Sequence, residues 1–419
     1  MNKELLKTVI AEQEYYFEQA KDSLEREFPE RFYHSAQIVV ISGIRRCGKS
    51  TLLQQIRSRQ AEKDYYLNFD DERLVNFNVE DFQMLLEVLH ELFGEQKTYY
   101  FDEIQNIDQW ERFVRRLHDA GNKVYITGSN ARMLSRELGT HLTGRYLSVE
   151  LYPFSYKEFI LLKNPELLTK NRFKTSVKAE YLSLFHDYLH NGGFPGFIKT
   201  KDELVLKTLF ENILYRDIMV RNNITNEKEI KLLVSYLAGN FARLSTNSEL
   251  TGIIGVKNPT TVKKYIGFLA DSYLVFQTNK YDYSLSKQIL NPKKSYFIDN
   301  GMVTRVGFSF SENQGHLLEN LIFIELLRRG KEVYYHHKNY ECDFVITEGK
   351  SVVSAIQVCY TFSSEKTQKR EINGLLDALN AYNLPSGLII TDDTEEELVT
   401  DSKTIKIIPA WKWLLDPES

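Results

Sequence analysis

Cysteine is scarce in this sequence. Cys47, Cys342 and Cys359 form an odd, scattered set, which provides neither a disulfide framework nor a CxxC metal site. We therefore expect a reducing compartment, the cytoplasm. No apolar h-region lies between Met1 and Glu14, so no signal peptide is expected. Apolar runs stay short of the roughly 20 residues that a membrane span needs, so no membrane association is expected either.

An excess of charge of one sign is also missing. The 53 Lys and Arg residues and the 57 Asp and Glu residues give a net charge of −4. This balance excludes a uniformly basic nucleic-acid-binding protein, although it allows a local basic patch. Apolar residues make up 42% and charged residues 26%, as in ordinary globular proteins. A chain of 419 residues corresponds to about two to three domains.

The order of strand and helix patterns predicts an α/β protein. Short apolar runs indicate strands at 37–41, 65–69, 98–101, 123–127 and 146–151. Helical patterns separate most of these runs, notably at 51–60 and 109–120. Strands that alternate with helices favour a parallel sheet that is covered on both faces.

The pattern changes beyond Pro153 and predicts further domains. Helical periodicity continues through a Gly-rich break at 191–196, and a helix, turn, helix and strand follow over 244–278. A second α/β unit begins near Glu319. We therefore predict three domains: a nucleotide-binding domain at 1–155, a helical and winged-helix region at 156–285, and a C-terminal α/β domain at 286–419.

A phosphate-binding loop follows the first predicted strand. The segment 43–50 matches G-x-x-x-x-G-K-[ST] in full and leads into an apolar helix, which is the context that this P-loop motif requires. Its glycines let backbone N–H groups point at phosphate oxygens, and the helix dipole favours an anion there. Lys49 is expected to reach the β- and γ-phosphates, and the Ser50 hydroxyl to bind Mg²⁺. The loop residues are Gly43, Ile44, Arg45, Arg46, Cys47, Gly48, Lys49, Ser50 and Thr51.

Two acids end the third predicted strand. Next to the phosphate loop, Asp102 can enter the Mg²⁺ shell, and Glu103 can accept a proton from the attacking water or orient it. The alternative is a solvated strand end. Asn130 follows the next strand and can sense the γ-phosphate, unless the segment is a simple turn. Arg145 can stabilise transition-state charge within its own chain or across a subunit interface of a homo-oligomer, and the alternative is a surface salt bridge.

Four motifs together resemble the bacterial and archaeal AAA-superfamily ATPases. They are GIRRCGKST (43–51), YYFDEIQNIDQWERFVRRL (99–117), ITGSNARMLSRELGTHLTGR (126–145) and LYPFSYKEF (151–159). The resemblance covers nearly the whole chain and implies ATP as the nucleotide. It also implies the phosphate and Mg²⁺ roles of Lys49 and Ser50, the roles of Asp102 and Glu103, and a sensor role for Asn130. The paired Arg45 and Arg46 match the family without a firm role.

The middle region has the length of a helix-turn-helix. Pro259 suits a first helical turn, and Lys257, Lys263 and Lys264 give the start of the second helix a basic character without an acid. Such a helix can follow a DNA backbone. A winged helix that contacts a protein or acts as a lid stays open as the alternative. The family resemblance also implies a winged helix.

The C-terminal unit of the family resembles the restriction-endonuclease fold. Active members of that fold use a helix acid, an Asp and an (E/Q)-x-K strand motif to hold Mg²⁺ and activate water. Here Glu319, Asp343 and Gln357 occupy the acid positions, and Cys359 stands where the lysine should be. A neutral thiol cannot supply that charge, so we expect a structural or binding domain. Nuclease activity would require a lysine from elsewhere in the chain, such as Lys366 or Lys369, in place of the missing one.

These observations lead to one main hypothesis. The sequence predicts an ATPase that binds ATP and Mg²⁺ and acts as a molecular switch or assembly factor on an unidentified protein client. The alternative is a DNA-binding or DNA-processing ATPase that uses the winged helix.

Overall fold

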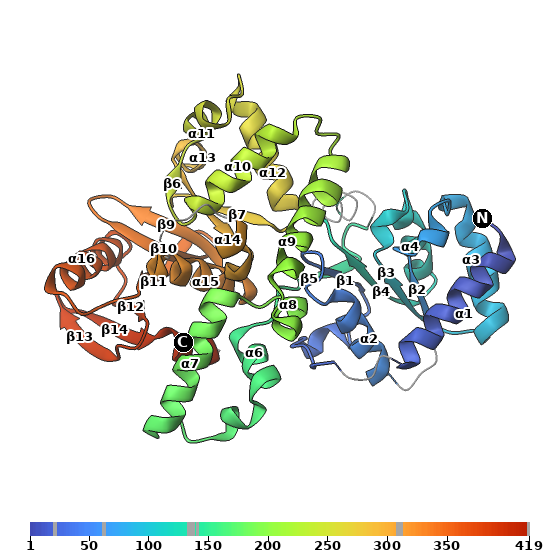
Figure 1. Cartoon of the computed structure of the whole chain (residues 1–419), viewed down its shortest axis with the longest axis horizontal. Helices are drawn as coiled ribbons and strands as arrows, with labels where there is room; N and C mark the ends of the chain where they lie inside the picture. The colour runs from blue at the N-terminus through green and yellow to red at the C-terminus, as the bar shows by residue number, and fades with distance from the viewer. Residues whose placement is uncertain (20–22, 61–63, 132–138, 140–141, 307–312, 417–419) are drawn as a thin grey trace. The chain divides into compact units, whose positions relative to one another are not determined.

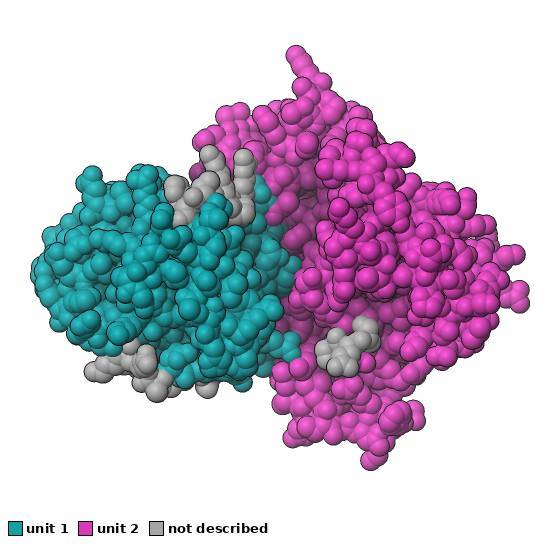
Figure 2. Space-filling view, turned by 180° about the vertical axis from the view of Figure 1, so that it is seen from behind, with its two compact units in different colours: residues 1–152, 271–273 teal, residues 153–270, 274–419 magenta. Residues whose placement is uncertain are grey.

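The computed structural model describes residues 1–19, 23–60, 64–131, 139, 142–306 and 313–416 (Figure 1). The chain divides into two compact units, which Figure 2 shows in two colours. Unit 1 comprises residues 1–152 and 271–273, and unit 2 comprises 153–270 and 274–419. Part of the quoted motif at 126–145 falls on residues 132–138 and 140–141, outside the described residues.

A five-stranded parallel sheet forms the centre of unit 1. Its strand order is β2-β3-β4-β1-β5, and every neighbouring pair is parallel. The strands are β1 (Ile38–Ser42), β2 (Tyr65–Asn68), β3 (Thr98–Asp102), β4 (Lys123–Gly128) and β5 (Tyr146–Glu150). All five lie where the apolar runs predicted strands, so the predicted α/β class is confirmed.

Helices cover both faces of this sheet. Side chains alternate between the faces along each strand, and most successive residues of β1 to β4 are buried, so both faces need a cover. One face belongs to a core with helices α1 (Lys3–Gln19), α3 (Phe82–Phe93) and α4 (Trp110–Asp119). Helix α2 (Lys49–Arg59) packs against β3 and β4. Short 3-10 turns complete the unit at Glu30–Phe32, Glu72–Leu74, Val79–Asp81 and Ile104–Asn106.

Unit 2 begins with a run of helices. These are α6 (Tyr156–Lys163), α7 (Thr175–Asn191), α8 (Pro195–Thr200), α9 (Glu203–Asn212) and α10 (Glu227–Gly239), with a 3-10 turn at Pro165–Thr169 and a π-helical stretch at Ile213–Val220. A three-stranded antiparallel sheet of order β6-β8-β7 follows. Its elements in chain order are β6 (Leu244–Ser245), α11 (Asn247–Ile254), α12 (Pro259–Asp271), β7 (Val275–Thr278), α13 (Leu285–Leu290) and β8 (Lys293–Phe297).

A mixed six-stranded sheet forms the C-terminal part of unit 2. Its order is β13-β14-β12-β11-β10-β9, with β12 parallel to both β11 and β14 and the other pairs antiparallel. The elements are α14 (Asn300–Val306), α15 (Gln314–Arg328), β9 (Glu332–His337), β10 (Glu341–Glu348), β11 (Ser351–Cys359), α16 (Glu365–Ala381), β12 (Ser386–Thr391), β13 (Glu396–Thr400), β14 (Lys403–Pro409) and α17 (Ala410–Leu415). The domain boundary predicted near 285 falls inside unit 2, between strands β7 and β8 of one sheet.

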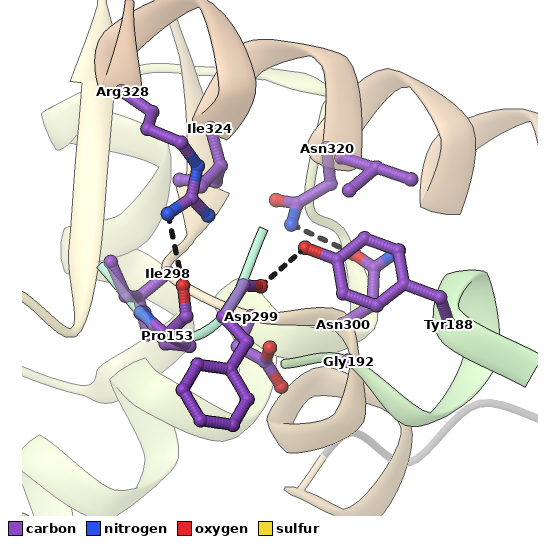
Figure 3. Close-up of a pocket in the computed structure, with 11 residues that line it drawn as sticks. Pro153, Tyr188, Gly192, Ile298, Asp299, Asn300, Asn320, Ile324 and Arg328 are labelled. Carbon is purple, nitrogen blue, oxygen red and sulfur yellow. Dashed lines mark hydrogen bonds between the residues drawn. The ribbon is translucent and has the colours of Figure 1, made fainter. Parts of the chain in front are cut away.

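In the Gly-rich break at 191–196, Gly192 packs closely against Asp299 (Figure 3). The Asp299 carboxylate accepts a hydrogen bond of 2.6 Å from the Gly193 backbone N–H. A Cβ atom on Gly192 would lie 2.0 Å from an Asp299 oxygen, so a larger residue does not fit there. The break therefore marks a tight contact in the core of unit 2.

No helix in the described part of the chain is both long and apolar enough to cross a lipid bilayer.

Candidate functional site

The phosphate-binding loop joins the end of β1 to the start of α2. Gly43 has φ of 148°, and a Cβ atom there would lie 2.1 Å from the Leu151 carbonyl oxygen. Gly48 has φ of 106°, a conformation that favours glycine, directly before the first residue of α2. Both motif glycines are therefore required by the local backbone, and the loop ends at a helix N-terminus as the motif predicts.

The other loop residues contribute in different ways. The side chains of Ile44 and Cys47 are fully buried, so these two residues present only backbone to a ligand. Arg45 forms an ion pair of 3.7 Å with Asp70, which follows β2. Arg46 has φ of 65°, a left-handed conformation that lets the loop turn.

Lys49 lies under the loop with 4% of its surface exposed. Its Nζ donates to the carbonyl oxygens of Gly43 and Ile44, at 3.2 Å each, and lies 3.4 Å from Glu103 Oε1. Burial acts to lower the pKa of Lys49, but the charges of Glu103, Cys47 and Asp102 and the hydrogen bond to Glu103 together outweigh it, and the pKa lies above its ordinary value. The side chain is therefore a charged ammonium group, held next to the loop's anion-binding backbone.

Asp102 ends β3 in a fully buried position. Thr127 on β4 donates a hydrogen bond to Asp102 Oδ1, and Ser50 lies close enough to hydrogen-bond to the carboxylate and lower its pKa. Burial and the Glu103 charge outweigh these contacts and raise the pKa of Asp102. Within the described residues, Asp102 Oδ2 has no hydrogen-bond partner. A buried free carboxylate oxygen beside a serine hydroxyl fits Mg²⁺, which prefers such oxygen ligands.

Glu103 follows Asp102 and turns the chain away from the sheet, with φ of 51°. Its N–H donates to Thr127 Oγ1 at 2.9 Å, and its carboxylate accepts a hydrogen bond from Gln105 Nε2. Burial acts to raise the pKa of Glu103, but the charge of Lys49 and the Gln105 hydrogen bond outweigh it and lower the pKa. Glu103 is therefore an ionised carboxylate at the carboxyl end of β3.

The structure brings Asn130 toward this site but not Arg145. Asn130 follows β4 at the same edge of the sheet as Asp102 and is buried. Arg145 precedes β5, whose first residue pairs with the first residue of β1, at the opposite edge. Four strand residues separate that edge from Ser42, which corresponds to roughly 13 Å. The Arg145 guanidinium instead donates to Asp119 Oδ1 at 2.9 Å. The sheet register thus places Arg145 away from Ser42, in contact with Asp119, and its catalytic role stays a prediction.

Three further residues at the site escaped the sequence analysis. Arg26 is buried and donates to the carbonyl oxygens of Cys47 at 2.6 Å and Tyr152 at 2.8 Å, so it supports the loop. Gln105 and Thr127 hold the two acids. A lone arginine in an irregular segment carries no sequence signal. Gln105 and Thr127 did lie within the quoted motifs, so their spacing from Glu103 and Asn130 was the available signal.

The predicted nuclease-like residues also lie together, within unit 2. Gln357 Oε1 accepts a hydrogen bond of 3.2 Å from the Asp343 N–H, and Lys294 Nζ lies 2.9 Å from carboxylate oxygens of both Glu319 and Asp343. Cys359 is different, because its thiol contacts the Thr361 carbonyl and burial raises its pKa to about 12. The suggested replacement lysines, Lys366 and Lys369, are exposed on α16, whereas Lys294 of β8 stands beside the acids.

Comparisons with known proteins agree with the first site. An AAA-domain family model matches residues 35–160. An uncharacterised protein from Methanocaldococcus jannaschii is 37% identical over 400 residues, which covers 90% of this chain and 88% of that protein. The chain belongs to an AAA-domain protein family. An uncharacterised protein from Haemophilus influenzae is 31% identical to this AAA protein over 396 residues, with 90% and 94% of the two chains covered.

The rest of the AAA protein matches families without an assigned role. Two models described as domains of unknown function match residues 182–312 and 314–413. The winged helix and the nuclease-like fold therefore stay predictions. Among solved structures, the Thermotoga maritima RuvB Holliday junction branch migration motor is 13% identical, with 66% of this chain and 90% of that chain covered and a TM-score of 0.28. Aeropyrum pernix ORC2 in its ADP form is 12% identical, with 65% and 86% covered and a TM-score of 0.34.

Proposed function

We propose that this AAA protein binds and hydrolyses ATP with Mg²⁺ and acts as a molecular switch or assembly factor in the cytoplasm. The observation that carries the proposal is the convergence of Lys49, Asp102 and Glu103 at the carboxyl ends of β1 and β3. A charged lysine, a buried acid beside a serine hydroxyl and an ionised second acid are the groups that phosphoryl transfer to water needs.

Each side chain has a distinct task in the proposed reaction. The loop N–H groups and Lys49 bind the phosphates, and Lys49 exchanges its contact with Glu103 for phosphate oxygens. Ser50 and Asp102 would hold Mg²⁺, which when bound neutralises charge on the phosphate oxygens. Glu103, released from Lys49, accepts a proton from water or orients it. Asn130 lies at the same sheet edge and would contact the terminal phosphate.

The substitution Lys49→Ala tests the proposal. We expect undetectable ATPase activity and strongly weakened ATP binding, because the ammonium group at the phosphate position is lost. Phosphate release and equilibrium binding of a fluorescent ATP analogue are the measurements. Lys97→Ala, an exposed lysine before β3, is the matched control and should keep wild-type activity. Wild-type turnover by Lys49→Ala would refute the site. Because Lys49 is buried, the thermal midpoint of unfolding must be recorded for both variants.

A specific observation favours DNA as a second ligand. The order α10-β6-α11-α12-β7-α13-β8, with β6, β7 and β8 in one antiparallel sheet, is the order expected of a winged helix apart from the short helix α13 between β7 and β8. Lys257, Lys263 and Lys264 are exposed at and just before the start of α12. Exposed lysines at one helix end suit contacts with a phosphate backbone. The salt dependence of DNA binding distinguishes this function from contact with a protein client.

A further inference from the structure

Unit 2 contains a buried lysine among three carboxylates, whereas the proposed ATPase site belongs to unit 1. Lys294 is 2% exposed. Its Nζ lies 2.9 Å from Glu319 Oε1, 2.9 Å from Asp343 Oδ1 and 2.7 Å from Glu341 Oε1. Three oxygens from two elements, α15 and β10, therefore converge on one cation that a third element, β8, delivers.

The surrounding framework fixes the carboxylates in place. Tyr296, two residues after Lys294 on the same face of β8, donates to Glu319 Oε1 at 2.8 Å. Asp343 Oδ2 accepts a hydrogen bond of 3.1 Å from the Val358 N–H on β11. Glu319 and Asp343 are thus oriented by groups other than the lysine, and their arrangement does not depend on the lysine alone.

The charges in this cluster do not balance. Three carboxylates face one ammonium group, and both Glu319 and Asp343 are more than nine-tenths buried. One lysine therefore leaves a surplus of negative charge, which is the condition under which a doubly charged ion would bind more strongly than an ammonium group.

We propose that this cluster is a cation site that the chain fills with its own Lys294, and that a divalent cation takes the place when the ammonium group is removed. Oxygens at 2.7 to 2.9 Å from one point need to move inward by less than about 1 Å to reach Mn²⁺ or Mg²⁺ distances. The native C-terminal sheet consequently needs no metal ion. Lys294 holds the β6-β8-β7 sheet against α15 and β10 in the way a structural metal would.

The substitution Lys294→Met in the full-length chain tests this proposal. Methionine keeps the length of the side chain and removes its charge. We expect this variant to bind one Mn²⁺ ion per chain more than the wild type, as measured by electron paramagnetic resonance of free Mn²⁺. Its thermal midpoint should rise by a few degrees when Mn²⁺ is about 100-fold above its dissociation constant. The wild type and Lys293→Met, a control on the adjacent strand position, should show neither effect.

Two further variants make every outcome decisive. Lys294→Met/Asp343→Asn should lose the additional Mn²⁺ ion. If Lys294→Met does not fold without metal, Lys294→Met/Glu319→Gln carries less repulsion and should fold and bind Mn²⁺. The proposal would be overturned if Lys294→Met or Lys294→Met/Glu319→Gln folded without binding an additional ion, or if both of these variants stayed unfolded even in millimolar Mn²⁺. Mg²⁺-dependent plasmid cleavage by the wild type that Asp343→Asn abolishes would also overturn it, because the acids would then hold metal natively.

Discussion

The substitution Glu103→Gln separates ATP binding from hydrolysis in the proposed site. It keeps the size of the side chain and removes the negative charge that accepts a proton. In the structure the Glu103 carboxylate lies 3.4 Å from Lys49 Nζ and accepts a hydrogen bond from Gln105. The substitution therefore perturbs the reaction in two places, the proton acceptor and the partner of the phosphate-binding lysine.

The structure predicts opposite effects on these two steps. A positioned acid–base group contributes about 10² to 10⁴-fold, so turnover should fall at least about a hundredfold, or roughly 3 to 5 kcal/mol in the barrier. Unit charges 3.4 Å apart attract by roughly 5 kcal/mol at an effective dielectric constant of about 20, before desolvation is counted. Lys49 gives up this attraction when it turns to phosphate. The variant lacks it, so its dissociation constant for ATP should equal or fall below that of the wild type.

Equilibrium binding and single-turnover hydrolysis measure the two effects separately. Glu80→Gln, which changes an exposed acid in the same unit, should leave both quantities unchanged. Turnover near the wild-type rate would show that Glu103 is not the proton acceptor. A dissociation constant for ATP more than tenfold higher than that of the wild type would show that the carboxylate supports the loop. The proposal that Lys49 exchanges Glu103 for phosphate would then be wrong.

Two other predictions concern residues away from the loop. Arg145 lies at the opposite sheet edge and pairs with Asp119, so Arg145→Ala should reduce ATP turnover only if two subunits share each site. In that case, a mixture of Arg145→Ala and Lys49→Ala proteins should recover some ATPase activity. Normal turnover by Arg145→Ala alone would leave a surface salt bridge as its role. Lys263→Ala/Lys264→Ala should weaken DNA binding and lower the slope of log affinity against log salt by about 2, measured by fluorescence anisotropy. An unchanged slope would argue for a protein contact.

The sheet of unit 1 could be predicted because its signals are local. Each strand is a short apolar run, and the P-loop fixes which strand end carries the phosphate site. The positions of Asp102 and Asn130 follow, because the carboxyl ends of parallel strands share one edge. Arg145 shows the limit of this reasoning. Its motif suggested catalysis, but only the register of β5 against β1 reveals that it lies at the other edge.

Contacts between distant segments could not be predicted in the same way. Arg26 reaches the loop across 21 residues, and Lys294 reaches Asp343 across 49 residues. Neither belongs to a motif. The strand 293–297 carried one weak signal, since Lys294 and Tyr296 alternate with other residues and therefore share a face. A charged residue on the buried face of a strand requires a partner, but the sequence does not say which acid provides it.

Within the described part of the chain, two buried lysines thus lie beside carboxylates, and their geometries point to different uses. Lys49 has one carboxylate at 3.4 Å and two carbonyl contacts at 3.2 Å, all on or next to a loop whose backbone can accept an anion. A ligand that carries several negative charges can replace these contacts. Lys294 has three carboxylates within 2.9 Å, so an anion would have to displace all of them. Lys49 should therefore exchange its contacts when ATP binds. Lys294 should keep its contacts in the presence of ATP, and its site should bind another cation only when a substitution removes the ammonium group.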